Sequence, residues 1–171
     1  MVRPGARLHP IVHGGTQEAG KRAGAENVPG IAALGAAARI ARQEMTARAA
    51  RSRELAARLT GGLLRVPDVR LNGHPERRIP GHVQVSVGWV DGESLCLALA
   101  ARGVAVSPGS ACTAAGKAAP ALEAIGLQPP WTHSAILLTL RATTTEAEVD
   151  HAVAAFADAV AALRAMSPIA P

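Results

Sequence analysis

Large aromatic side chains are almost absent from this chain, and their absence limits the kind of core it can build. Among its 171 residues there are two tryptophans, one phenylalanine and no tyrosine. Trp89, Trp131 and Phe156 are therefore the only large rings, although the hydrophobic fraction is 49%. A chain of this length can bury a sizeable core. That core must be built from Ala, Val, Leu and Ile, and small aliphatic side chains each bury little area.

Cysteines and long apolar runs are also scarce. The two cysteines, Cys96 and Cys112, exclude the disulfide framework that is typical of small secreted domains. The most apolar run, residues 152–163, is interrupted by Asp158, so no run reaches membrane-spanning length. The first residues lack the apolar segment of a signal peptide. These absences predict a soluble, cytoplasmic protein with no membrane partner.

Basic charge is present, but it comes almost entirely from arginine. The net charge is +5, and Lys21 and Lys117 are the only lysines. Arginines between residues 39 and 58 are spread along one predicted helix without aromatic residues on which bases could stack. We therefore expect a solvated helix face and no nucleic-acid partner.

His9 and His13 are four residues apart, but Pro10 argues against a helix there, and no metal site is predicted.

Apolar spacing predicts strands that alternate with helices. A long helix is expected over residues 31–59, ended by Gly61 and Gly62. Strands are expected at residues 69–71, 82–89, 104–106 and 134–141. Shorter helices are expected from the cap Asp91 to residue 102, at 119–125, and from a capping box of Thr145 and Glu148 to about residue 166. Such alternation predicts an α/β or α+β layer fold.

One loop carries a candidate nucleophile. Residues 107–113 read Ser-Pro-Gly-Ser-Ala-Cys-Thr, and the small neighbours Gly109, Ser110 and Ala111 leave the Cys112 thiol unencumbered. A thiol attacks as its thiolate, so an exposed loop in which backbone N–H groups or cations favour that charge suits nucleophilic chemistry. Cys96 lies instead in an apolar helical stretch, where a buried cysteine behaves as a small hydrophobe. We expect Cys96 to have a packing role.

Four segments, taken together, resemble the cysteine desulfurase family, a branch of the class-V aminotransferases of pyridoxal phosphate fold-type I. They are residues 13–18 with 24–30, residues 90–95, residues 107–113, and residues 133–134 with 144–150. Their order and approximate spacing match the family's C-terminal portion. The resemblance implies an α/β, two-layer C-terminal domain. In it, residues 1–30 form a Gly-rich arm of the large domain, residues 31–62 a long linking helix, and residues 63–171 the small domain with the sulfur-transfer loop.

The resemblance implies a reaction, a cofactor and partners. The reaction is pyridoxal phosphate-dependent sulfur transfer from L-cysteine, which gives alanine and a persulfide on Cys112 for iron–sulfur cluster assembly or other sulfur delivery, with Thr113 following in the loop. Gly14, Gly15 and Gly24 are implied to contact the cofactor phosphate of the other subunit, since backbone N–H groups suit an anion. The implied partners are a second copy in a homodimer or a separate N-terminal cofactor-binding half, and a sulfur-acceptor or scaffold protein.

The sequence departs from the family pattern at several functional positions. The family's Schiff-base lysine follows a Ser-x-His motif, and neither Lys21 nor Lys117 lies in that context. Ala25 replaces a threonine whose hydroxyl touches the cofactor phosphate. Leu137 replaces an arginine that grips the substrate carboxylate, and Arg141 matches a second family arginine instead. We therefore expect the chain alone to bind no pyridoxal phosphate and to release no sulfide from cysteine.

Three situations fit these departures. The chain is a truncated remnant of a desulfurase, one half of a split enzyme, or an independent small domain that carries or relays sulfur. The alternative to an enzyme is thus a non-enzymatic sulfur carrier or dimerisation module derived from a desulfurase. His133 matches a family histidine that precedes a strand, for which packing or a hydrogen bond is the expected role.

Overall fold

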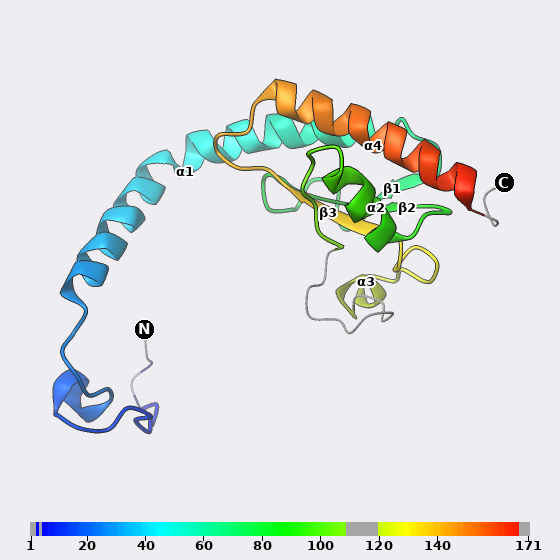
Figure 1. Ribbon diagram of the computed structural model, residues 1–171. Helices are drawn as coiled ribbons and strands as arrows, with labels where there is room; N and C mark the ends of the chain where they lie inside the picture. Colours follow the sequence, from blue (N-terminus) through cyan, green and yellow to red (C-terminus); the bar gives the residue numbers. More distant parts are fainter. Residues whose placement is uncertain (1–2, 4, 109–119, 168–171) are drawn as a thin grey trace. The chain divides into compact units, whose positions relative to one another are not determined.

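The computed structural model describes residues 3, 5–108 and 120–167 (Figure 1). The chain divides into two compact units, Met1–Met45 and Thr46–Pro171. In the described part of the first unit, one 3-10 turn, η1 (Gln17–Gly20), precedes the helix α1 (Val28–Leu63), which continues into the second unit. Among these described residues of the first unit, only Ala23 is buried. The first unit therefore has almost no core of its own.

The helix α1 is longer than predicted at both ends. It was expected over residues 31–59 and ended by two glycines, but it continues through Gly61 and Gly62 to Leu63. The reason is close packing: a Cβ atom at Gly62 would lie 2.5 Å from the Cγ2 atom of Val153 on helix α4 (Glu146–Met166). Gly62 allows two helices to approach, and it is not a C-cap.

Three strands form one antiparallel sheet in the order β1-β2-β3, namely Val69–Leu71, His82–Val87 and Ala135–Thr139. Strand β2 ends two residues earlier than predicted because the chain turns at Gly88 and Trp89, where Trp89 has a φ of 65°. The strand expected at residues 104–106 is wrong as well. In its place, a single bridge joins Ser107 to Leu137.

The core lies on one face of the sheet. Strand residues there include Val83, Val85 and Ile136, all fully buried, and Phe156 of α4 is also fully buried. Leu55, Leu59 and Leu63 reach the same cluster from the second half of α1, and helix α2 (Gly92–Ala100) adds Leu95 and Leu99. The prediction of an aliphatic core is confirmed. The fold is a mixture of helices with a small antiparallel sheet, with α3 (Pro120–Ala124) packed in a second, smaller cluster.

Helix ends follow the capping chemistry that the sequence predicted. Asp91 caps α2, since its Oδ1 accepts a hydrogen bond from the Ser94 N–H at 2.8 Å. Thr145 and Glu148 form the capping box of α4, with the Thr145 N–H donating to Glu148 Oε2 at 2.7 Å. These hydrogen bonds favour the carboxylate, so the pKa of Glu148 is lowered. Gly103, with a φ of +79°, follows the last turn of α2.

Within the second unit, the second half of α1 lies alongside α4 (Figure 1), and ion pairs join the two helices. The Arg58 Nε and Nη2 atoms each donate to one oxygen of Asp150 at 2.7 Å. Arg51 and Arg58 also reach the two oxygens of Glu146 at 3.1 and 3.4 Å. The guanidinium of Arg58 lowers the pKa of Asp150 through these hydrogen bonds. The solvated arginine face predicted for this helix therefore includes a bidentate contact with α4.

Candidate functional site

The loop with the candidate thiol begins at the outer edge of β3. Ser107 and Leu137 exchange two backbone hydrogen bonds, with N–O distances of 3.1 and 2.6 Å. The predicted loop residues Gly109, Ser110, Ala111, Cys112 and Thr113, together with Lys117, lie outside the described residues. The start of the loop, Ser107, is thus hydrogen-bonded to Leu137, the β3 residue that replaces the family's arginine.

Leu137 lies on the sheet face opposite the core. Its neighbours Ile136 and Leu138 belong to the core cluster, and side chains alternate along a strand, so Leu137 faces the other way. It is half-buried and stands directly opposite Gln84 of β2. An aliphatic side chain cannot donate hydrogen bonds to a carboxylate. The structure therefore brings together the base of the loop and a residue that cannot serve as a carboxylate clamp.

A polar cluster on this second face was missed by sequence reasoning. Ser86 lies opposite Arg70 and Ala135 in the register. Its hydroxyl donates to the Trp131 carbonyl at 2.7 Å and accepts from the Asn72 amide at 2.9 Å. The Arg70 guanidinium carbon lies 4.9 Å from the centre of the Trp131 ring, a cation–π distance. The only sequence signal for this cluster was a serine at a buried strand position. The arginine–tryptophan contact gave no signal, because its two residues lie far apart in the sequence.

Arg141 is not on the strand. Strand β3 ends at Thr139, so its predicted extension to residue 141 is wrong, and the Arg141 N–H donates instead to the Thr144 hydroxyl at 3.0 Å in the following turn. Arg141 therefore does not take the place of Leu137.

His133 is exposed, and its Nδ1 lies 3.3 Å from the Thr132 hydroxyl oxygen, which agrees with the expected hydrogen bond.

The Gly-rich arm has some of its backbone N–H groups engaged internally in the conformation described. Gly14 and Gly24 have positive φ angles of 146° and 95°, as a ligand-binding loop often requires. However, the Gly24 N–H donates to the Gln17 Oε1 atom at 3.2 Å, and the Ala23 N–H donates to the Val12 carbonyl. These N–H groups are engaged within the arm, and Ala25 has no hydroxyl to add. The phosphate contact implied for Gly14, Gly15 and Gly24 therefore stays a prediction.

Cys96 is a packing residue, as expected. It is half-buried on α2 and packs against the core. Burial is the largest cause, and together with the nearby carboxylates of Asp91 and Glu93 it raises the pKa of the Cys96 thiol to about 11. At neutral pH this sulfur is almost entirely protonated, so it is a poor nucleophile.

No group of three or more His, Cys, Asp or Glu side chains in the described part of the chain is arranged to hold a metal ion. Likewise, none of the described helices is both long enough and apolar enough to cross a membrane.

Sequence comparison relates nearly the whole chain to known proteins. The family profile described as Aminotransferase class-V matches residues 9–152. The chain is 40% identical over 169 residues to Cysteine desulfurase IscS 1 of Archaeoglobus fulgidus, covering 98% of this chain and 44% of that protein. It is 39% identical over 171 residues to Cysteine desulfurase IscS of Methanosarcina thermophila, covering 99% and 42%. The chain thus spans less than half the length of these relatives.

Comparison with solved structures gives the same picture of the fold. A NifS-like protein aligns over 95% of this chain and 41% of its own, with a TM-score of 0.81 and 29% identity. A second NifS-like protein, from Rickettsia africae, aligns over 90% of this chain and 40% of its own, with a TM-score of 0.77 and 23% identity. The second likeness concerns the fold alone.

Proposed function

We propose, from the premise that this chain belongs to the aminotransferase class-V family, that it is the sulfur-accepting portion of a cysteine desulfurase. The observation that carries the proposal is the roughly 40% identity to cysteine desulfurases along 98% of the chain. The thiol of Cys112 is the proposed acceptor. Its loop begins at the Ser107–Leu137 bridge, so the acceptor is tethered to a rigid sheet edge by a few small residues.

The chemistry assigned to this chain is acceptance of sulfur. The Cys112 thiolate attacks the sulfur of substrate cysteine, and a sulfur–sulfur bond forms as the bond between that sulfur and the substrate Cβ breaks. The electron pair of the broken bond stays with the carbon fragment, which gains protons and leaves as alanine, and Cys112 carries the persulfide. A thiolate of the acceptor protein then takes the outer sulfur, and Cys112 leaves as a thiolate. In the proposed enzyme, pyridoxal phosphate supplies an electron sink for the substrate. The phosphate contact of the arm glycines Gly14, Gly15 and Gly24 is a prediction, so no step of that chemistry is assigned to them. Leu137 supplies no clamp for the substrate carboxylate.

A partner surface supports the idea that the cofactor lies on another region. Along α1, Ile31, Leu34, Ala38, Ala41 and Met45 recur at alternating spacings of three and four residues, which puts them on one face of a helix. All five are exposed, the three large ones by 59%, 71% and 65% of their surface. We call them the 31–45 stripe. Its proposed occupant is the cofactor-binding region of a desulfurase, on the same or a separate polypeptide, in a homodimeric assembly.

A second candidate function is a sulfur carrier without enzymatic activity. It is favoured by two departures from the family pattern, Ala25 in the arm and the aliphatic Leu137 on β3. A carrier requires only the reactive loop and a persulfide donor. Both candidates share Cys112 as the acceptor and differ in whether a cofactor-binding region restores turnover.

Mass spectrometry of the Cys112 persulfide tests the proposal. The chain is mixed with an active cysteine desulfurase and L-cysteine, and in a second arm it is co-expressed with a cofactor-binding region that contains Ser-x-His-Lys. The desulfurase function predicts persulfide and sulfide release in the second arm; the carrier function predicts persulfide in the first arm alone. Cys96→Ser is the matched control and should behave as the wild type. Absence of persulfide from both arms, with Cys112→Ser indistinguishable from the wild type, contradicts both functions.

A further inference from the structure

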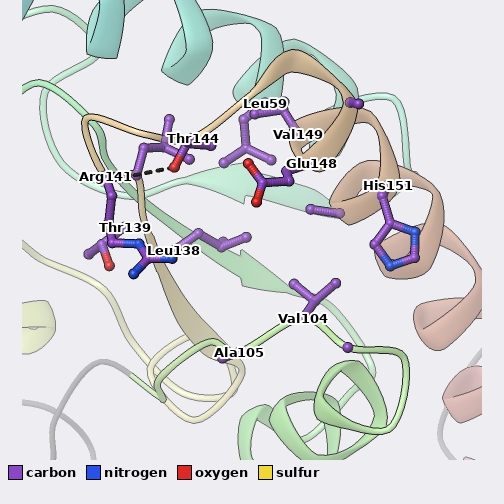
Figure 2. Close-up of a pocket in the computed structure, with 14 residues that line it drawn as sticks. Leu59, Val104, Ala105, Leu138, Thr139, Arg141, Thr144, Glu148, Val149 and His151 are labelled. Atoms are coloured by element: carbon purple, nitrogen blue, oxygen red, sulfur yellow. Dashed lines mark hydrogen bonds between the residues drawn. The ribbon is translucent and has the colours of Figure 1, made fainter. Parts of the chain in front are cut away.

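We propose that the second unit has a binding site for an extended, aliphatic peptide segment of a partner protein, in the cavity beside the open edge of β3 (Figure 2). This site does not depend on Cys112 or on the proposed sulfur transfer. The cavity has a volume of about 750 Å³, within the range of about 300–1,000 Å³ that is usual for ligand pockets.

The cavity has an apolar floor built from three elements. Leu59 of α1, Leu138 of β3 and Val149 of α4 line it, and all three are at least 95% buried. Val104 and Ala105 form the opposite wall, across from Arg141 and Glu148 in Figure 2. Such a floor stabilises a bound aliphatic side chain by removing apolar surface from water.

The hydrogen-bond register leaves a donor and an acceptor facing this cavity. In an antiparallel ladder, successive residues direct their N–H and C=O groups to alternate sides. Leu137 directs both to Ser107, at the outer edge, while the Leu140 N–H returns inward to the Gly81 carbonyl. Thr139 therefore also directs its N–H and C=O groups outward, and it lines the cavity. Among the described residues, no backbone group pairs with this edge of the sheet at Thr139.

The chain's own neighbouring segment leaves this edge unfilled. Continuing the Ser107–Leu137 register would place Ala105 opposite Thr139. Within the described residues, no backbone hydrogen bond joins these two residues. The Val104 N–H donates instead to the Leu99 carbonyl at 3.0 Å, which holds the segment at the end of α2. The cavity is the space left between the two diverging segments.

The chemistry of this space fits an extended peptide better than a charged small molecule. A peptide that lies along a strand edge pairs its own C=O and N–H groups with one edge residue, and its side chains enter adjacent pockets. The rim carries one cation, Arg141, and one anion, Glu148, so it offers no net charge to select a phosphate. His151, also at the rim, has its Nε2 atom 2.9 Å from the Arg102 carbonyl oxygen. Apolar side chains and a backbone amide are what the site accommodates.

Hydrogen exchange and amide chemical shifts of the full chain test the site. The probe is a capped hexapeptide, N-acetylated and C-amidated, with Val and Leu alternating with Thr. Saturable shifts are expected at Thr139, Leu138 and Val149, with slower exchange of the Thr139 amide. If the shifts do not saturate at peptide concentrations up to about 1 mM, binding is too weak and the proposal is overturned. The proposal is also overturned if, without peptide, the Thr139 amide is protected from exchange as strongly as the Leu138 amide. The chain's own segment would then fill the edge.

Two matched changes isolate the backbone contact. N-methylation of the probe's central residue removes a peptide donor without altering the protein, and Thr139→Pro removes the donor at the edge, where proline is tolerated. Each should weaken binding about fivefold, the usual worth of one hydrogen bond. The control Arg141→Ala should change affinity for this neutral probe less than about twofold. An unchanged affinity for the N-methylated probe, or a larger loss in Arg141→Ala, contradicts the strand-edge geometry.

Discussion

At the scale of single residues, the surroundings of a side chain decide its chemistry. Cys96 illustrates this, because the same apolar helix that makes it a packing residue also suppresses its thiolate. Cys112 was singled out by the opposite features, a loop of small residues and a family motif. The two thiols should therefore differ strongly in reactivity.

The first prediction concerns alkylation of these thiols. With a pKa of about 11, Cys96 should react with iodoacetamide very slowly at neutral pH. Its rate should rise about tenfold per pH unit as the thiolate fraction grows toward that pKa. Cys112 should react faster at neutral pH. Peptide mass mapping over a pH series measures both rates in the folded chain, with Cys96→Ser as the control. Equal rates of the two cysteines at neutral pH would contradict the assignment.

At the scale of helices and strands, close approach and charge pairing determine how α1 meets α4. Gly62 touches Val153 at a distance that leaves no room for a methyl group, whereas a Cβ at Gly61 would meet nothing within 4 Å. Adjacent glycines in one helix thus have opposite roles, which provides a matched pair of variants.

The second prediction uses this pair. Gly62→Ala should lower the free energy of unfolding by about 1–3 kcal/mol, because overpacking forces the helices apart. Gly61→Ala should raise it by up to about 1 kcal/mol, since alanine is the better helix former. Urea denaturation measures both. Val153→Ala should partly rescue Gly62→Ala, and a stabilising Gly62→Ala would show that the helices do not touch there.

The third prediction concerns the pH dependence of the contact between Arg58 and Asp150. The pKa of Asp150 is lowered in the folded chain, so the folded state favours its ionised form relative to an unfolded value of about 3.9. The stabilisation is present above the unfolded pKa and is lost as pH falls through the folded pKa. In Asp150→Asn, the melting temperature should fall at neutral pH and converge with that of the wild type in acid. High salt should reduce the difference, because the pair is exposed.

Local signals explain how much of the fold could be predicted. Asp91 and the Thr145–Glu148 box place helix starts because capping depends on residues within three positions. Gly62 was misread because its role depends on Val153, far along the chain. The strand at 104–106 failed for a similar reason: alternation cannot reveal that Val104 is held by the end of α2.

The candidate site was predictable only as far as its motif. The loop and Leu137 came from family resemblance, and the bridge between Ser107 and Leu137 brings the two together. The contact between Arg70 and Trp131 could not be foreseen, because pairing of β1 with β2 creates it.

At the scale of the whole molecule, the two units differ in how much they bury. The second unit contains the aliphatic core, and the described part of the first buries only Ala23. An isolated helix gains little stability without packing, even when it is rich in alanine. The part of α1 that belongs to the first unit should therefore open independently of the core.

The fourth prediction concerns hydrogen exchange along α1. Amides of residues 28–45 should exchange through local opening, with protection far below that of residues 55–63. Adding a cofactor-binding region of a desulfurase should increase protection of residues 28–45 selectively. Mass-spectrometric exchange of peptic peptides measures this profile, and Leu34→Asp should abolish the increase while Ala33→Asp retains it. Equal protection of both segments in the isolated chain would contradict the absence of a local core.

The placement of the two indoles has an optical consequence. Trp89 and Trp131 both belong to the second unit, and the chain has no tyrosine. Trp131 lies beneath the Arg70 guanidinium, while Trp89 is partly exposed and donates its indole N–H to Asp68 at 3.3 Å. Intrinsic fluorescence therefore follows the sheet and its turns alone, and it is blind to residues 1–45. Emission and helical circular dichroism, recorded during one thermal melt, would consequently trace two different events in the same molecule.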